Sequence, residues 1–357
     1  MITGSLSRNF DEALQLDYGN VKLGSEYRDL LYNKENKHSD FLELSLKNDI
    51  DKSISKELEI KIKLSDKPKE KPEIFDWKYS INDELESEKE DKDIFQGILK
   101  SEFPIESLNL KIDYIGAFRE VPKVNYLYES KDYDNIGLKG ENAYPILIQD
   151  KEDKRELLNN ISNWYKENFE DWMSTHDISN LPMDKLKEMR SGVLSEVVDF
   201  RNTRSISVED GVQKISQMLF QQFGKNGFSK DMDIQAQSDG TVRLLSLVPA
   251  LYDAMKSAKT VIIDELDHSI HSHLVRELVR YFSSQDTNGQ LIFTTHQTCL
   301  LNQDFLRTDE AWMVEKKDGG SHMYSLNDFK IHNTINIENG YMEGRYGAIP
   351  FIGELNM

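Results

Sequence analysis

Three short segments near the start of the chain alternate apolar and polar residues. FLELSL, ELEIKIKL and IFDWKYSI lie between residues 41 and 81, and turns rich in lysine, aspartate and proline separate them. Such alternation places the apolar side chains on one face, as in half-buried antiparallel strands. The pattern predicts an antiparallel β subdomain. The charged run from Asp83 to Asp93 that follows is interpreted as a solvated loop or the start of a helix.

A different period begins at about Lys151. Apolar and aromatic residues recur there at steps of three and four, which places them on one stripe of a helix. They are Leu157, Leu158, Ile161, Trp164, Tyr165, Phe169 and Trp172. We expect a helical subdomain over residues 151–230. The two tryptophans share the apolar stripe and are interpreted as core anchors, not as a platform for stacked bases.

The last third of the chain alternates predicted strands with predicted helices. TVRLLSLVPALYDAM and HLVRELVRYF have helical patterns, whereas TVIIDEL, QLIFTT and EAWMVEK have strand patterns, as does LNLKIDYIGAF from Leu108 onward. Strands that are apolar on both faces and separated by helices are typical of a parallel sheet. The sequence therefore predicts an α/β fold with a β-rich part over residues 1–150 and a lobe over residues 231–357. We expect the chemistry at the C-terminal ends of the parallel strands.

Composition narrows the classes of function. The chain has 44 Lys and Arg against 63 Asp and Glu, and its net charge of -19 argues against a diffuse basic surface for nucleic acid. Any contact with DNA or RNA is expected to be local. One cysteine, Cys299, excludes a disulfide framework, and no apolar run approaches the roughly 20 residues that span a membrane. Because the first residues also lack the pattern of a secretory signal, we expect a cytoplasmic protein.

Two adjacent carboxylates follow a predicted buried strand. Val261, Ile262 and Ile263 lead directly into Asp264 and Glu265. Two buried like charges cost several kcal/mol unless a cation or a reacting water uses them. This is the Walker B arrangement, in which Asp264 holds Mg²⁺ through water and Glu265 orients and deprotonates the attacking water. A surface acidic turn is the less favoured interpretation.

A histidine follows the next predicted buried strand. Leu291 to Thr295 end in His296, about 30 residues after the acid pair, so its side chain is expected at the same edge of the sheet. A lone histidine after a strand is usually a packed or capping residue. Its place in a matching β-α-β unit favours a sensor for the γ-phosphate of a nucleotide.

A short polar segment, Ser238-Asp239-Gly240-Thr241, precedes the long predicted helix. Its hydroxyl, glycine backbone and helix N-terminal amides have the chemistry to cradle an anion, although an ordinary helix cap explains the same residues. Position decides between them, because the segment lies 23 residues before Val261, in the order signature motif, Walker B, switch histidine. Arg243, one turn into the helix, either supports the phosphate or is a solvated arginine.

These segments together resemble a known family. SDGTVRLLSLVPALYDA, VIIDELDHSIHSHL, QLIFTTHQTCLL, the DEAWMVEK strand and GRYGAIPF look like the ABC-like AAA-family ATPases of abortive-infection and other anti-phage systems, which resemble SMC and RecF-type heads. VKLGSEYRDLLY and DYIGAFREVP extend the resemblance less specifically. The expected fold is an ABC-ATPase-like P-loop NTPase core with an antiparallel β subdomain and a helical insertion.

The resemblance implies a site shared between two heads that sandwich ATP and Mg²⁺. Ser238 and Gly240 would contact a γ-phosphate in trans, and Asp267 to His271 would form a D-loop across the interface. Three histidines near this loop, His268, His271 and His273, do not converge on one helix face, so we expect them at an interface or surface and not at a zinc site. The partner would be a second head of the same or another chain.

No segment of the chain matches the G-x-x-x-x-G-K-[ST] loop that the family uses to bind phosphates. FGKNGFSK, around Gly224 to Lys230, has the wrong spacing and is interpreted as a helix-ending loop. Three explanations stay open: a start placed too late, a split or degenerate protein, and a partner that donates its signature to a complete ATPase subunit.

Two functions follow from these patterns. The leading hypothesis is an ATP-binding and hydrolysing dimer whose closure drives an effector, such as a nuclease, in phage defence. The alternative is a non-catalytic regulatory or scaffold subunit that donates its signature motif in trans. A DNA-repair head that clamps DNA ranks last, because basic clusters such as KDKPKEKPE are too mixed in sign to form a basic stripe.

Overall fold

The computed structural model describes residues 17–18, 21–22, 41–51, 53–63, 73–88, 108, 110–120, 125–126, 133, 135–152, 157, 159–161, 175–182, 207–209, 212–223, 228–233, 236–301, 305–317, 320–331 and 336–349. The chain divides into two compact units. One unit spans residues 112–300, and the other combines residues 1–111 with residues 301–357. Among the residues in these ranges, no helix has the length and apolar character needed to cross a membrane.

A three-stranded parallel sheet lies in the unit of residues 112–300. Its strands are β7 (Ile112–Ile115), β13 (Thr260–Ile263) and β14 (Gln290–Phe293), in the order β14-β13-β7. Ile263 pairs with Ile115 on one side and with Phe293 on the other, so all three strands end at the same edge. The predicted parallel strands at these positions are confirmed, although β14 is only half-buried and Ile292 is 46% exposed.

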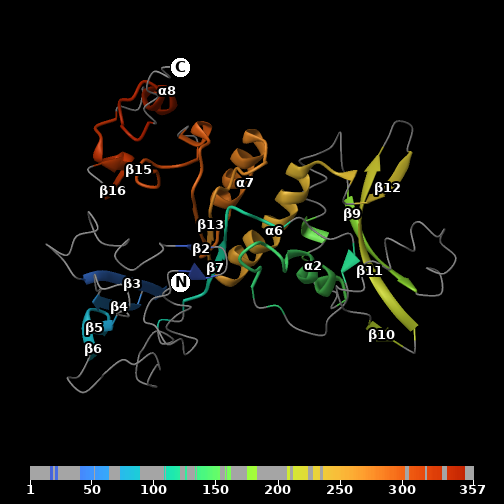
Figure 1. Ribbon diagram of the computed structural model, residues 1–357, viewed down its shortest axis with the longest axis horizontal. Helices are drawn as coiled ribbons and strands as arrows, with labels where there is room; N and C mark the ends of the chain where they lie inside the picture. The colour runs from blue at the N-terminus through green and yellow to red at the C-terminus, as the bar shows by residue number, and fades with distance from the viewer. Residues whose placement is uncertain are drawn as a thin grey trace. The chain divides into compact units, whose positions relative to one another are not determined.

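Helix α6 (Asp239–Ser257) lies beside the parallel sheet of this unit (Figure 1). It packs against β13 and β14, and α2 (Ala143–Glu152) packs against it. Ten of its residues are buried, including Leu244, Leu245 and Leu251, as its apolar sequence predicted. It ends at Ala258, whose N–H donates to the Ala254 carbonyl and whose left-handed backbone (φ 51°) lets the next N–H, that of Lys259, donate to the same carbonyl (3.3 Å).

Helix α7 (Ser272–Ser284) connects β13 to β14 and has the predicted amphipathic pattern. Its apolar stripe, which includes Val275, Leu278 and Val279, is buried. The turn before β14 lies close to the end of α6. A Cβ atom added to Gly289 would be 2.3 Å from the Ala254 carbonyl oxygen, so only glycine fits this approach without a backbone shift.

A buried ion pair joins β7 to the start of β13. Asp113 is 6% exposed, and its carboxylate lies 3.5 Å from the ammonium of Lys259, which also pairs with Asp253 at 2.5 Å. Burial raises the pKa of Asp113, and Lys259 opposes the shift. The pKa of Lys259 is raised because its bonds to the two carboxylates outweigh its own burial.

Strands form most of the described part of residues 151–230, so the expected helical subdomain is not what the structure shows there. The sheet contains β8 (Asn125–Tyr126), β9 (Thr175–Pro182), β10 (Ser207–Glu209), β11 (Val212–Phe223) and β12 (Ser229–Asp233), all antiparallel to β11. The helical period that motivated the prediction runs only from Leu157 to Trp172. Of its seven residues, Leu157 and Ile161 are helical, and the other five lie outside the described residues.

The segment between β11 and β12 corrects a second expectation. FGKNGFSK was interpreted as a helix-ending loop, but β11 ends at Phe223 and β12 begins at Ser229. Phe223 pairs with Ser229 in an antiparallel ladder, so the residues between them connect two strands. The glycines of this segment did not reveal which elements it joins.

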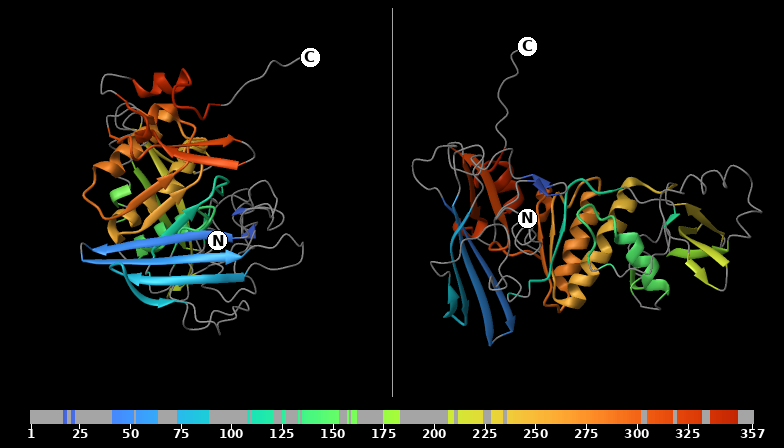
Figure 2. Two further views of the ribbon diagram at one scale, coloured as in Figure 1. Left: turned by 90° about the vertical axis from the view of Figure 1, so that its left-hand side faces the viewer. Right: turned by 60° about the horizontal axis from the view of Figure 1, so that its bottom comes forward.

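The other unit contains a four-stranded antiparallel sheet, drawn in blue and cyan in Figure 2. Its strands are β3 (Phe41–Asp51), β4 (Ile54–Lys63), β5 (Glu73–Ile81) and β6 (Glu84–Glu88). The predicted antiparallel strands are confirmed, and Leu58, Ile60 and Ile62 form the buried face of β4. The charged run contributes a strand at Glu84–Glu88, because a short turn lets it pair with β5 at the solvent-exposed edge. The same unit also contains the short pair β1 (Asp17–Tyr18) and β2 (Val21–Lys22).

The EAWMVEK segment belongs to this second unit and not to the parallel sheet. It forms β15 (Trp312–Lys317), which pairs antiparallel with β16 (Gly320–Ser325). Met313 is buried whereas Trp312 and Val314 are exposed, so the segment is half-buried and not apolar on both faces. Met313 packs with Leu326, Ile337 of α8 (Ile337–Met342) and Tyr346. The short 3₁₀ helices Thr298–Leu301 and Leu326–Asp328 complete the described elements.

Candidate functional site

The acid pair lies in the turn that follows β13. The Asp264 N–H donates to the Ile115 carbonyl (2.9 Å), which ties the turn to the end of β7. Glu265 has a left-handed backbone (φ 46°), a conformation that costs free energy for any residue other than glycine. The His268 N–H closes the turn by donating to the Glu265 carbonyl (2.9 Å). The sheet thus presents both carboxylates at its C-terminal edge, as the sequence predicted.

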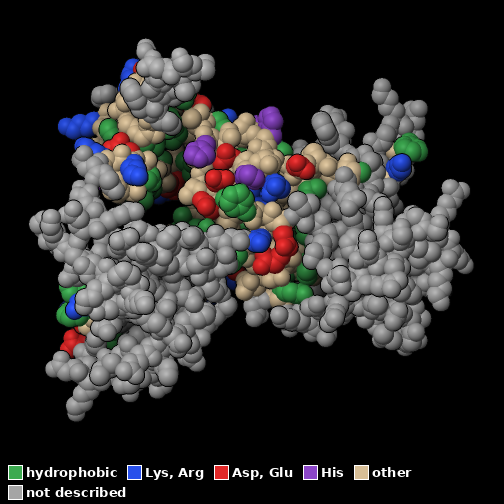
Figure 3. All heavy atoms as spheres, viewed as in Figure 1, with side chains coloured by type: hydrophobic (Ala, Val, Ile, Leu, Met, Phe, Trp, Pro, Cys, Tyr) green, Lys and Arg blue, Asp and Glu red, His purple; other side chains and the backbone are tan. Residues whose placement is uncertain are grey.

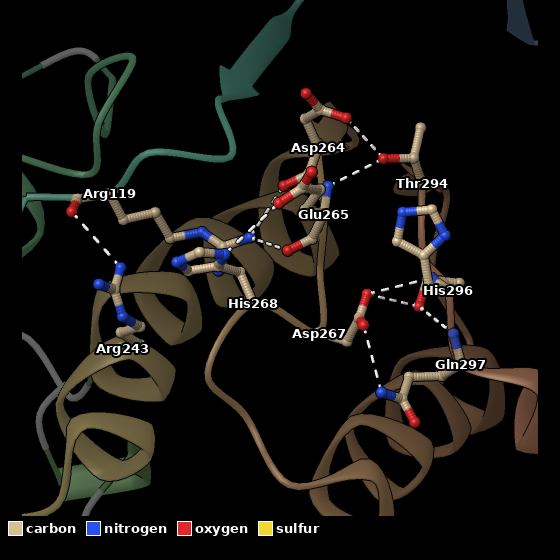
Figure 4. Close-up of polar contacts among 10 residues, drawn as sticks. Arg119, Arg243, Asp264, Glu265, Asp267, His268, Thr294, His296 and Gln297 are labelled. Carbon is tan, nitrogen blue, oxygen red and sulfur yellow. Dashed lines mark hydrogen bonds and ion pairs between the residues drawn. The ribbon is translucent and has the colours of Figure 1, made fainter. Parts of the chain in front are cut away.

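Thr294, just after β14, holds the acid pair through a single hydroxyl (Figure 4). Its Oγ1 accepts from the Glu265 N–H (2.8 Å) and donates to Asp264 Oδ1 (2.5 Å). The Leu266 N–H donates to the Thr294 carbonyl (2.9 Å). The turn is therefore fixed by the ends of both neighbouring strands.

Both carboxylates are more exposed than the sequence suggested. The Glu265 side chain is 46% exposed, and Asp264 is half-buried. The argument from the cost of burying two like charges therefore does not hold within this chain, because water reaches them. The position of the pair at the edge of the parallel sheet is what supports a catalytic interpretation.

Asp267 connects the same turn to the residues after β14. Its Oδ1 accepts from Thr295 Oγ1 (2.7 Å) and from the His296 N–H (3.3 Å), and its Oδ2 accepts from Gln297 Nε2 (3.2 Å). Partial burial alone would raise the pKa of Asp267, but these hydrogen bonds outweigh it and lower the pKa below the usual 3.8. Asp267 is thus charged at neutral pH and bonded within its own chain.

An arginine that the sequence did not single out lies beside the acid pair. Arg119, four residues after β7 ends, is 5% exposed, and its Nη2 donates to the carbonyl oxygens of Asp264 (3.0 Å) and Glu265 (2.8 Å). Arg243 Nη1 donates to the Arg119 carbonyl (3.5 Å). The signal that identified Asp264, a charged residue directly after a buried strand, does not single out Arg119, which stands four residues beyond the end of β7.

The predicted signature residues lie at the start of α6. Ser238 is the N-cap: its Oγ accepts from the Thr241 N–H (3.2 Å) and lies 2.8 Å from Thr241 Oγ1. Asp239 is in the first turn. A Cβ atom added to Gly240 would be 3.0 Å from the carbonyl oxygen of Ser269, which itself has a left-handed backbone (φ 61°). The signature segment and the turn after β13 therefore lie against one another.

The histidines occupy three different positions around this turn. His268 Nδ1 lies 3.4 Å from Glu265 Oε2, and His271 is the N-cap of α7, where its Nδ1 accepts from the His273 N–H (3.2 Å). The His296 side chain is exposed at the end of β14. Figure 3 shows histidine, acidic and basic side chains gathered on the face that α6, α7 and β13 occupy in Figure 1.

The side chains of this site could bind Mg²⁺ only together with a nucleotide, whose phosphates would supply further ligands. Within the described ranges no three His, Cys, Asp or Glu side chains form a group that could hold a metal by themselves. Mg²⁺ commonly binds through one or two carboxylates together with water and substrate phosphates. Asp264 fits this role, because Thr294 occupies one carboxylate oxygen and no hydrogen bond to the other is seen among the described residues.

The described residues place acidic side chains at the C-terminal edge of a parallel sheet, and a family match indicates an α/β nucleotide-binding protein of the P-loop NTPase class. The sequence model of one family, described as "AAA domain, putative AbiEii toxin, Type IV TA system", matches residues 4–302. Because the match covers well over half of the chain, the chain belongs to this family of AAA domains. A comparison with curated proteins gave no match. Family membership implies the use of nucleotide, usually with Mg²⁺.

Proposed function

We propose that the chain is an ATPase subunit that binds ATP with Mg²⁺ and hydrolyses it at the Asp264–Glu265 turn. The observation that carries the proposal is the way this turn is held, with Asp264 bonded to the end of β7 and both acids bonded to Thr294 after β14. A turn that needed only to connect β13 to α7 would not require these bonds. Preorganised polar groups at a strand edge are the usual means of positioning a phosphate reaction.

Each acidic residue has a distinct role in this proposal. Asp264 would hold a hydrated Mg²⁺ ion, which would neutralise part of the phosphate charge. Glu265, whose carboxylate is open to solvent, orients the attacking water and accepts its proton. His296, at the end of β14, contacts the γ-phosphate.

Association of two heads is the second part of the proposal. Ser238 and Gly240, at the exposed N-terminus of α6, would meet the nucleotide of a second head, and the loop from Asp267 to His271 would lie at the contact. Closure of the heads would drive an effector such as a nuclease. The family description, which names a toxin and a toxin–antitoxin system, supports a role in abortive infection, and we propose that the protein acts in the cytoplasm of phage-infected cells.

The experiment that tests the ATPase proposal is Glu265→Gln. Hydrolysis should fall at least about 100-fold because the amide cannot accept the proton of water, whereas ATP binding should stay within about twofold. Phosphate release and calorimetric titration with ATP and Mg²⁺ measure the two effects. Glu277→Gln, which changes a half-buried acid on α7 paired with the exposed Arg280, should leave both unchanged.

Either of two results would contradict the proposal that the chain is an ATPase with Glu265 as its base. The first is a wild-type chain that releases no phosphate at saturating ATP and Mg²⁺. The second is Glu265→Gln with wild-type turnover, which would remove Glu265 as the base.

A further inference from the structure

Arg119 is a buried cation whose position is unusual for a structural residue. It is 5% exposed, and its Nη2 bonds two successive backbone carbonyls, those of Asp264 (3.0 Å) and Glu265 (2.8 Å). Its Nε and Nη1 are also buried, and neither has a hydrogen-bond partner within the described parts of the chain. The guanidinium thus uses one of its three nitrogens, and uses it on the acid turn.

Keeping this charge buried costs free energy that its hydrogen bonds only partly offset. Burial, together with the charge of Arg243, lowers the pKa of Arg119 to about 10, although Asp267, Asp264 and Glu265 oppose the shift. At neutral pH the side chain is still charged. A buried charge with unmade hydrogen bonds is often replaceable by an apolar residue at no loss of stability. Stability alone therefore gives a poor reason for an arginine at this position.

The two carbonyls that Arg119 bonds flank the strained residue of the turn. Glu265 has φ 46°, and a non-glycine residue keeps such a conformation only when its surroundings fix the peptides on either side. Arg119 fixes the carbonyl of the peptide before Glu265 and the carbonyl of the peptide after it. Thr294 fixes the Glu265 N–H from the opposite side (Figure 4). Because the backbone at Glu265 sets the direction of its Cα–Cβ bond, these contacts also aim its carboxylate.

The loop that carries Arg119 also contacts the signature helix. Arg243 Nη1 donates to the Arg119 carbonyl at 3.5 Å, so the N-terminal part of α6 and the acid turn are joined through one residue. This contact is to the backbone of Arg119, so it does not depend on the side chain at that position. A change of the side chain therefore tests the contact with the acid turn alone.

We propose that Arg119 is a positioning residue that holds Glu265 in its left-handed conformation and so aims the Glu265 carboxylate at the attacking water. This inference rests on the proposed ATPase function. It assigns to Arg119 a role in catalysis without contact to the nucleotide.

The first test separates turnover from nucleotide binding in the full chain. Arg119→Met should lower kcat about 10- to 100-fold, because a misdirected base loses catalytic geometry, and should leave KM and the Kd for ATP within about twofold. Arg119→Lys, which can still donate to a carbonyl, should restore part of kcat. Lys259→Gln is the matched control: it alters another largely buried cation, which pairs with Asp113 and Asp253, and should keep kcat. Wild-type kcat in Arg119→Met, or an equal loss in Lys259→Gln, would overturn the proposal.

The second test does not depend on turnover. Glycine adopts positive φ without strain, so Glu265→Gly removes the need to hold the backbone. The change in Tm caused by Arg119→Met should then be less destabilising in the Glu265→Gly background than in the wild type. Equal changes in Tm in the two backgrounds would show that Arg119 does not hold this conformation. If the wild-type chain hydrolyses no ATP, the ATPase proposal fails, and this cycle still decides whether Arg119 fixes Glu265.

Discussion

Single side chains, more than whole elements, determine where the two candidate catalytic acids lie. Asp264 and Glu265 could be predicted from the sequence because they follow a buried strand, and His296 because it follows the next one. Arg119 and Thr294 could not be predicted in the same way, because they act on backbone groups of the turn. Backbone groups look the same at every residue, so no pattern of residue types reveals which carbonyl or amide a side chain will reach.

At this scale Thr294→Val should lower the free energy of unfolding by about 1 kcal/mol, because the Glu265 N–H and the Asp264 carboxylate each lose a partner while the side-chain volume is kept. Thr294→Ser should retain most of the stability. Denaturant unfolding measures both.

Thr260→Val is the control for the threonine change, because Thr260 Oγ1 makes only a long bond to Gln290 (3.3 Å) among the contacts described. It should change the free energy of unfolding by less than about 0.5 kcal/mol. A Thr294→Val protein as stable as the wild type would mean that water replaces the hydroxyl and that the turn is held by other groups.

At the scale of elements, the spacing of the apolar residues predicted a helix or a strand correctly wherever the same spacing continued from the start of the element to its end. The alternating strands β3 to β5, the helices α6 and α7 and the strand β13 were predicted for this reason. The prediction over residues 151–230 was wrong where the helical period had ended, since β9, β11 and β12 follow it in sequence. The place of β15 was also wrong, because its antiparallel partner β16 could not be inferred from the strand alone.

The close approach of β14 to α6 leads to a prediction about this packing. Gly289→Ala should lower the free energy of unfolding by about 1–3 kcal/mol, because the new Cβ would be 2.3 Å from the Ala254 carbonyl oxygen and the backbone must shift. Thermal or denaturant unfolding measures the loss.

Gly116→Ala provides the comparison for Gly289→Ala. Its added Cβ would be 3.4 Å from the Leu138 carbonyl oxygen, which the structure accommodates with little movement. We expect a change below about 0.5 kcal/mol. Equal losses for the two variants would show that the loss of glycine itself, and not the contact with α6, determines stability.

At the scale of the whole molecule, the acidic chain carries its candidate site beside a helix N-terminus that is exposed. Ser238 and Asp239 are exposed at this end of α6, which has positive partial charge from its unpaired amides. The net charge of -19 opposes association of two copies. Nucleotide held between two such helix ends would supply the attraction that the chain lacks.

Ser238→Arg should therefore prevent ATP-dependent association while the monomer stays folded, because Ser238 is exposed and a long charged side chain would occupy the space of the nucleotide. Sedimentation with and without ATP and Mg²⁺ measures the effect. Ser238→Ala should cost about 1 kcal/mol of helix capping but keep the association. If Ser238→Arg associates as the wild type does, the helix end does not lie at the contact between heads.

The buried pair of Asp113 and Lys259 acts on the folding of the chain more than on the stability of the finished fold. The two residues are 146 positions apart, so no tight turn sets how β7 lies along β13. A slip of one residue would turn Asp113 to the other face of the strand and leave Lys259 without that carboxylate. Lys259 would keep its pair with Asp253, but the Asp113 carboxylate would lose its cation, so misaligned intermediates would dissociate instead of becoming kinetic traps.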